Sequence, residues 1–194
     1  MTTHIEEIAS AWKGHRDFAH WLVQRLQPQI TVELGVDYGY STFVLATNNP
    51  GQVYGIDLFM GDAHSGAKDA DEQYQQVMDF KLAHGFDNIE IIRNDFNTVA
   101  AGWDKKIDIL HIDGLHTYDA VSNDFRTWAP HVRDGGVIIM HDVTAFADVA
   151  RFFQDDIVLP RLFFSHSAGL GVVSADQALL IEIEKTFAGV QVVQ

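Results

Sequence analysis

Short apolar runs alternate with longer amphipathic stretches along most of this 194-residue chain. The apolar runs are rich in Ile, Val and Leu and lie at residues 30–34, 53–56, 89–92, 107–112 and 137–140. Stretches with helical spacing lie at residues 40–47, 71–84, 116–128 and 146–157. Apolar strands that alternate with helices form a mostly parallel sheet covered on both faces. The sequence therefore predicts a doubly wound, Rossmann-like α/β fold.

The two ends of the chain depart from this alternation. Residues 5–26 have the spacing of one or two helices, interrupted near Gly14 and closed by Pro28. We expect segment 1–28 to pack on the sheet or cap it. Near the other end, the runs 162–165 and 171–174 are too close for a crossover helix and should form an antiparallel pair. A chain of this length can bury one core, so we expect a single domain over residues 1–194.

Composition narrows the classes of function. The chain has 27 acidic residues against 13 Lys and Arg, a formal charge of −14, which disfavours nucleic acid as a partner. Cys is absent, so a metal would have to bind His, Asp or Glu. The sequence has neither a secretory signal nor an apolar run of about 20 residues, the length of a membrane span. We therefore expect a cytoplasmic protein without a membrane span.

The segment VELGVDYGYS, residues 32–41, follows the first strand, where open α/β sheets bind ligands. Asp37 stands where a dinucleotide-binding loop needs bare glycine backbone, so a pyrophosphate is disfavoured. Glu33 and Asp37 suit a ligand with positive charge, such as the ammonium and sulfonium groups of S-adenosylmethionine. The alternative interpretation is a plain glycine turn with surface acids.

Acidic residues also follow the next two strands. Asp57 ends the second strand, where a carboxylate can accept hydrogen bonds from both hydroxyls of a ribose. Asp95 follows the third strand and could bind the exocyclic amine of adenine. It could equally cap the helix that begins at Phe96.

Four further motifs stand in a fixed order: GDAHSG (61–66), LHIDGLHTYDAV (110–121), DGGVIIMHDV (134–143) and HSAGLGVV (166–173). With these motifs and residues 33–39, the chain resembles the class I S-adenosylmethionine-dependent methyltransferases over roughly residues 31–174. Within them it is similar to methyltransferases of glycan gene clusters and, more distantly, to macrolide-sugar O-methyltransferases. The resemblance implies a seven-stranded sheet with one antiparallel strand, and a possible homo-oligomer. It assigns cofactor binding to Glu33, Gly35, Asp37, Tyr38, Gly39, Ser41, Asp57, Asp95 and Asp113.

Methyl transfer to a sugar hydroxyl requires a base beside the oxygen, a Lewis acid, or both. In the macrolide-sugar relatives, the Asp of an Asp-x-x-His pair binds magnesium and the His removes the proton. The resemblance extends these roles to Asp113 and His116. It places His141 and Asp142 as further ligands of the same ion. Magnesium prefers oxygen, and an imidazole is better suited to zinc, iron or manganese, so His141 leaves manganese open. In a metal-free variant, His116 or His141 would be the base.

Acceptor-binding residues are expected around the same end of the sheet. Asp62 and His64 lie in a long loop that could close as a lid. Tyr118 flanks a ligand loop, and His166 lies next to the end of a predicted strand. His111 lies inside an apolar run and is expected to be a buried ring bonded to backbone. The five remaining histidines are expected to be solvated: His4, His15, His20, His84 and His131.

These observations predict an S-adenosylmethionine-dependent O-methyltransferase for a small sugar or glycan acceptor, with a divalent metal and a histidine base. One alternative keeps the cofactor but exchanges the sugar for a catechol-like phenol. Another is a nucleotide-binding domain without catalysis, against which Asp113, His116 and Asp142 argue. A nicotinamide oxidoreductase is disfavoured because the middle glycine of the phosphate loop is missing.

Overall fold

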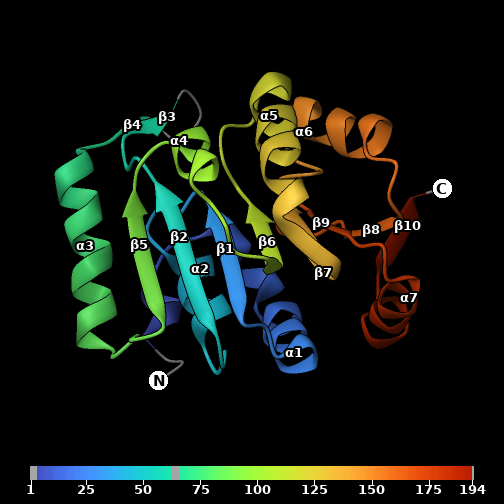
Figure 1. The fold of residues 1–194 in the computed structure, drawn as a ribbon, viewed down its shortest axis with the longest axis horizontal. Helices are drawn as coiled ribbons and strands as arrows, with labels where there is room; N and C mark the ends of the chain where they lie inside the picture. Colours follow the sequence, from blue (N-terminus) through green and yellow to red (C-terminus); the bar gives the residue numbers. More distant parts are fainter. Residues whose placement is uncertain (1–3, 63–65, 194) are drawn as a thin grey trace.

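A mostly parallel sheet of eight strands organises the chain in the computed structural model, which describes residues 4–62 and 66–193 (Figure 1). The strand order is β10-β8-β9-β7-β6-β1-β2-β5. Neighbouring strands from β5 to β7 pair in parallel, whereas β7–β9, β9–β8 and β8–β10 pair antiparallel. The bounds are β1 Ile30–Leu34, β2 Gln52–Asp57, β5 Ile89–Arg93, β6 Ile107–Ile112, β7 Val132–His141, β8 Arg161–Phe164, β9 Leu170–Val173 and β10 Val190–Val193.

Helices pack on both faces of this sheet, as the alternating sequence predicts; in Figure 1, α4 and α5 lie in front and α2 behind. Successive residues of a strand point to opposite faces. Ile109 accordingly belongs to a core cluster with α1, α2, α3 and α7, and Leu110 to a second cluster with α4, α5 and α6. The helices are α1 Arg16–Leu26, α2 Tyr40–Ala46, α3 Ala70–Ala83, α4 Phe96–Ala101, α5 Tyr118–Trp128, α6 Ala147–Arg151 and α7 Gln177–Thr186.

The N-terminal segment is helical and packs on the sheet, as predicted. Short 3-10 helices, η1 Ile5–Glu7 and η2 Ala11–His15, precede α1, so the interruption expected near Gly14 is the change from 3-10 to α geometry. The core cluster of α1 and α2 includes the buried side chains of Ile5 and Trp12. One domain over the whole chain stays a prediction.

Two expectations of the sequence need correction. The sheet has an eighth strand, β10, which pairs antiparallel with β8 at the sheet edge. The single helix expected over 146–157 is α6 followed by a π-helical turn, Phe152–Asp156, whose Phe152 and Phe153 are both buried. A π-turn shifts the register of the apolar residues, which allows both rings to reach the core.

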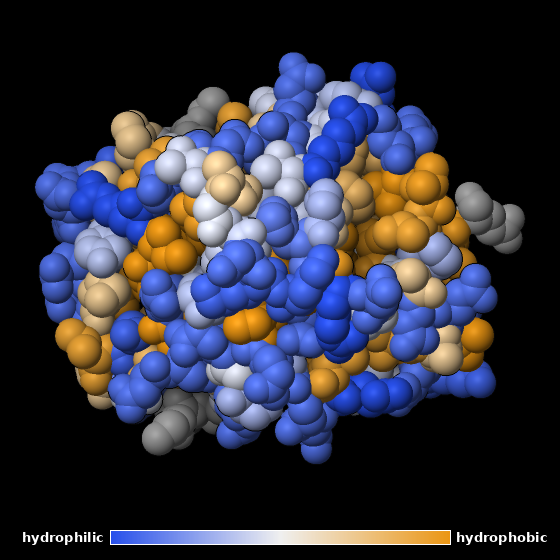
Figure 2. Space-filling model, in the orientation of Figure 1, coloured by the Kyte–Doolittle hydropathy of each residue, from blue (hydrophilic) through white to orange (hydrophobic). Residues whose placement is uncertain are grey.

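The surface is mainly hydrophilic in the view of Figure 2, and an apolar area lies beside α6 and the strands β8 and β10. Val158, Leu159 and Val192 are among the exposed apolar residues of that part of the chain. No helix of the described residues is long and apolar enough to cross a membrane.

Candidate active site

A cavity of about 690 Å³ is lined by residues at the carboxyl ends of the parallel strands. In Figure 1, the arrowheads of β1, β2 and β5 mark these strand ends. Its walls come from the segments that follow β1, β2, β5, β6 and β7, together with residues 9–11 of the N-terminal segment. The strand order reverses between β1 and β6, and the carboxyl ends of the strands at such a point form the usual ligand crevice of an open α/β sheet. Most of the residues expected at the site line it: Gly35, Asp37, Tyr38, Ser41, Asp57, Asp95, Asp113, His116, His141 and Asp142. Gly39, which was also expected to bind the cofactor, is not among the described residues that line it.

The turn after β1 is shaped by residues in left-handed conformation. Gly35, Asp37 and Gly39 have φ values of 93°, 52° and 88°. A Cβ at Gly35 would stand 2.0 Å from the carbonyl oxygen of Asp113, so only glycine allows the ends of β1 and β6 to approach this closely. The turn thereby brings its own backbone beside Asp113.

Asp57 holds this turn in place. Its Oδ2 accepts the backbone N–H groups of Val36 and Asp37 at 2.8 and 2.9 Å, and its Oδ1 accepts that of Phe59 at 2.7 Å. Two carboxylate oxygens offer about four acceptor positions. The three described bonds leave room for one hydroxyl donor, so Asp57 can shape the turn and still bind a ligand.

Asp95 likewise has two roles available. Its Oδ1 caps α4 by accepting the backbone N–H groups of Asn97 and Thr98, both at 3.0 Å. The described bonds of this carboxylate end on Oδ1, and the residue lines the cavity. Both alternatives drawn from the sequence are therefore compatible with its position.

Glu33 does not line the cavity, which corrects its expected contact with the cofactor. Its side chain is fully buried, accepts a hydrogen bond from Thr42 Oγ1, and pairs through Oε1 with His111 Nδ1 at 2.8 Å. The indole N–H of Trp12 donates to His111 Nε2 at 3.1 Å. His111 is thus buried as expected, but its partners are side chains because its ring lies between β1 and the N-terminal segment.

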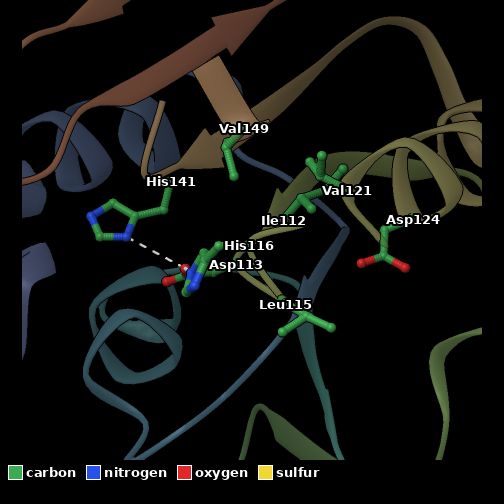
Figure 3. A pocket seen from close by; sticks show the side chains of 9 residues that line it. Ile112, Asp113, Leu115, His116, Val121, Asp124, His141 and Val149 are labelled. Atoms are coloured by element: carbon green, nitrogen blue, oxygen red, sulfur yellow. Dashed lines mark ion pairs between the residues drawn. The ribbon is translucent and has the colours of Figure 1, made fainter. Parts of the chain in front are cut away.

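Four titratable side chains gather in the cavity: Asp113 and His116 follow β6, His141 ends β7 and Asp142 follows it. His141 Nδ1 lies 3.4 Å from Asp113 Oδ1 (dashed line in Figure 3) and 3.2 Å from Asp142 Oδ2. His116 Nε2 lies 2.7 Å from Asp142 Oδ2 and 3.9 Å from Asp113 Oδ1. One ligand atom from each of Asp113, His141 and Asp142 lies within 4.8 Å of the others, as a shared cation would require.

Burial, charge–charge interactions and hydrogen bonds within this cluster change the pKa of each of its four side chains. Burial by itself would lower the pKa of both histidines, but the two carboxylates raise that of His116 to about 9 and that of His141 to about 10. Burial opposes ionisation of Asp113, yet the charge of His141 and hydrogen bonds from both rings hold its pKa below the ordinary value. The pKa of Asp142 is lowered in the same way. At neutral pH the cluster therefore holds two protonated rings and two carboxylates.

Neighbouring residues fix the orientation of these groups. The His116 ring stacks on Phe146, with centroids 4.2 Å apart and planes at 8°. His141 Nε2 lies 3.0 Å from the carbonyl oxygen of Ser167. Asp142 adopts a left-handed conformation with φ of 64°, which is rare outside glycine and recurs at functional sites.

The two expected acceptor residues whose side chains the structure describes, Tyr118 and His166, are not among the described residues that line the cavity. The Tyr118 hydroxyl donates to Asp156 at 2.7 Å, so its side chain faces the π-turn after α6 and is not among the described residues that line the cavity. His166 is exposed and stacks on His15 at 4.8 Å, also away from the described lining. The position of His64 and the side chain of Asp62 lie outside what the structure describes.

His15 is not solvated, contrary to expectation. It is fully buried, and its Nε2 lies 3.1 Å from the carbonyl oxygen of Ser167. Burial lowers its pKa to about 3, so the ring is neutral. Its position at the junction of η2 and α1 presses it against the turn between β8 and β9, a contact that no sequence spacing indicates.

Several lining residues were missed by reasoning from the sequence, among them Lys68, Gln73, Leu115, Phe146 and residues 9–11. Their types occur on any surface or in any core. Of these, Leu115 alone belongs to one of the motifs named above, LHIDGLHTYDAV, where it was given no role. Only their proximity to strand ends, as for Phe146 after β7, could have indicated them.

Comparison with known proteins supplies the family. The sequence model described as a methyltransferase domain matches residues 32–143, which include the first turn and the histidine–aspartate cluster. The chain belongs to this methyltransferase domain family. The methyltransferase domain expected from the sequence is therefore confirmed.

A curated protein matches most of the chain. Protein y4gI of Sinorhizobium fredii, an uncharacterized protein, is 31% identical over 183 residues, which are 88% of this chain but 20% of y4gI. The chain thus spans about a fifth of the length of this curated relative.

Solved structures show the same fold. A putative caffeoyl-CoA O-methyltransferase from Staphylococcus aureus matches with a TM-score of 0.68 and 15% identity, over 87% of this chain and 86% of the other. An O-methyltransferase from Bacillus cereus in complex with SAH (S-adenosylhomocysteine) matches with a TM-score of 0.64 and 16% identity, over 83% of this chain and 80% of the other. The Rossmann-like methyltransferase fold is thereby confirmed, with eight strands in place of seven.

Proposed function

We propose that this methyltransferase is an S-adenosylmethionine-dependent O-methyltransferase. The observation that carries the proposal is that the cluster of Asp113, His116, His141 and Asp142 opens into the same cavity as the turn after β1. A nucleoside cofactor and a hydroxyl acceptor could therefore meet beside groups suited to deprotonate the acceptor. The Bacillus cereus relative, which binds SAH, supports the choice of cofactor.

The cofactor would lie along the ends of β1, β2 and β5. Asp57 keeps acceptor capacity for a ribose hydroxyl, and Asp95 has an oxygen available for the exocyclic amine of adenine. The carboxylate of Asp37 lines the cavity and suits the ammonium of the amino acid part. The turn offers no run of bare glycine backbone for a diphosphate, which favours a sulfonium nucleoside over a dinucleotide.

Asp113, His141 and Asp142 fit a divalent cation by the proximity of their ligand atoms. Two carboxylates suit magnesium, and the imidazole of His141 favours manganese. Such a cation would supply a Lewis acid for the acceptor oxygen. Ligation requires a neutral ring, so His141 must give up its proton when the cation binds.

His116 is the proposed general base. Its ring is fixed by stacking on Phe146 and by the carboxylate of Asp142, and it lines the cavity. With a pKa of about 9 it holds a proton at neutral pH while both aspartates face it. Partial neutralisation of Asp113 and Asp142 by a cation would lower that pKa and release the base for catalysis.

The proposed acceptor is a hydroxyl of a small sugar or glycan. A specific observation favours a second candidate, a catechol-like phenol: the cavity is lined in part by the exposed apolar side chains of Leu58, Met60 and Leu115. A planar ring could pack against these side chains while a sugar would contact them less. A cytoplasmic location and a homo-oligomer stay predictions.

Initial rates of methyl transfer to panels of sugars and phenols, with and without manganese, test this proposal. We expect His116→Ala to lower kcat at least about 100-fold, the usual contribution of a general base, and to retain SAH affinity. Asp57→Ala should instead weaken SAH binding. An unchanged kcat in the His116 variant would remove this residue as the base, and absence of transfer to both panels would contradict the proposed reaction.

A further inference from the structure

Lys68 is the only lysine or arginine among the cavity-lining residues that the structure describes. The same lining contains five aspartates: Asp37, Asp57, Asp95, Asp113 and Asp142. A carboxylate on a bound ligand would be repelled by this acidic surface unless a cation stood beside it. The protonated rings of His116 and His141 each contact both Asp113 and Asp142, whereas Lys68 pairs with the single carboxylate of Asp37. Lys68 is therefore the cation with which a ligand carboxylate can pair.

The ammonium of Lys68 is held inside the cavity and does not extend into solvent as a surface lysine would. It forms an ion pair with Asp37 and lies 4.9 Å from the centroid of the Tyr38 ring. The side chain is 17% exposed. Its own backbone is fixed by a hydrogen bond from the Lys68 N–H to the carbonyl oxygen of Met60 at 3.0 Å.

Gln73 supplies an independent indication of a ligand. Its Nε2 donates to Asp37 Oδ1 at 2.7 Å, which orients the carboxylate beside Lys68. Its Oε1 is buried and has no hydrogen-bond partner in the described part of the chain, although the residue lines the cavity and is only 4% exposed. A buried acceptor without a donor costs free energy, so a ligand donor at this position would be favourable.

We propose that Lys68, Asp37 and Gln73 form a receptor for an α-amino acid zwitterion, in which Lys68 binds the carboxylate of the cofactor. This assignment rests on the proposed S-adenosylmethionine-dependent function. Asp37 and Gln73 Oε1 accept hydrogen bonds from the α-ammonium, and Lys68 Nζ donates to the α-carboxylate. The two charges of the protein thus complement the two charges of the ligand, and neither charge is left unpaired in the acidic cavity.

Calorimetry with three nucleosides tests the assignment. SAH carries both charges, decarboxylated S-adenosylmethionine carries the ammonium without the carboxylate, and 5′-methylthioadenosine carries neither. We expect Lys68→Met to raise the Kd of SAH by roughly 10- to 100-fold, the contribution of a charge-assisted hydrogen bond. The Kd of the other two should change less than about twofold, and the exposed Lys185→Met is the matched control.

The outcomes distinguish failure of the Lys68 assignment from failure of the proposed function. Equal weakening of all three nucleosides, or an unchanged Kd for SAH, overturns the role of Lys68 while the proposed function stands. Tighter binding of SAH by Lys68→Met also overturns it, because Lys68 would then compete with the ligand ammonium for Asp37. If the wild-type protein fails to bind SAH, the proposed function itself fails. Urea unfolding of each variant confirms that the fold is retained.

Discussion

Asp142 is the residue on which the geometry of the histidine–aspartate cluster depends most. Its Oδ2 contacts both His116 and His141, and its left-handed backbone turns the chain sharply at the end of β7. A non-glycine residue in this conformation costs about 1–3 kcal/mol and persists only where the surroundings enforce it. Here the carbonyl oxygen of Asp142 accepts the N–H of Ala145 at 3.1 Å, which stabilises the turn. The strained backbone conformation of Asp142 thus places its carboxylate in contact with both histidine rings.

Proton release should accompany cation binding at this cluster. The pKa values of about 9 for His116 and about 10 for His141 mean that both rings are protonated at pH 7. A cation must displace at least one proton, so its affinity should rise with pH by about tenfold per unit between pH 7 and 9. Manganese titrations by calorimetry at pH 7, 8 and 9 measure this slope.

The matched variant for that titration is Asp142→Asn, which tolerates the left-handed conformation and removes one charged ligand. Its manganese affinity should be at least about tenfold weaker. An affinity that does not depend on pH, or that Asp142→Asn leaves unchanged, would exclude these residues as the cation site.

At the scale of elements, a series of buried side-chain hydrogen bonds joins the N-terminal segment to the sheet. Trp12 on η2 donates to His111 on β6, which pairs with Glu33 on β1. Because the N–H of Trp12 points at Nε2, the proton of a neutral His111 ring must lie on Nδ1, facing Glu33. Residues 9–11, which line the cavity, stand immediately before this anchor.

Loss of the Trp12 donor should destabilise the fold measurably. Trp12→Phe leaves a buried acceptor on His111 without its partner, which costs about 1–3 kcal/mol. Trp128→Phe is the matched control, because Trp128 is equally buried and its indole Nε1 has no hydrogen-bond partner in the described residues. We expect the urea unfolding free energy to fall further for Trp12→Phe, and equal losses would show that only ring volume matters.

The elements differ in how well the sequence predicts them. Each central strand is fully buried at most positions, so its near-continuous apolar run was distinctive; β6 is buried at every residue. The edge strand β10 was missed because Val190–Val193 is short, half exposed and interrupted by Gln191. Its pairing with β8 depends on α7, whose reversal of the chain cannot be read from local spacing.

The site was predictable where a residue stands at a strand end and unpredictable where two surfaces meet. Asp57, Asp113, His141 and Asp142 were expected together because parallel strands end at one edge of the sheet, and all four line the cavity. The burial of His15 and the pairing of Glu33 depend on where η2 packs, which spacing does not determine.

At the scale of the whole molecule, the acidic cavity agrees with the overall charge of −14. A ligand with a positive sulfonium is attracted by such a field, whereas a diphosphate with two or more negative charges is repelled. The same fold could hold either class of cofactor, so the lining residues and not the topology decide between them.

Calorimetric titration of the wild-type protein with SAH, and separately with NAD, distinguishes a site for a sulfonium nucleoside from a site for a dinucleotide. We expect saturable binding of one SAH per chain and no measurable heat with NAD at the same concentrations. Tight binding of NAD together with no affinity for SAH would contradict this expectation.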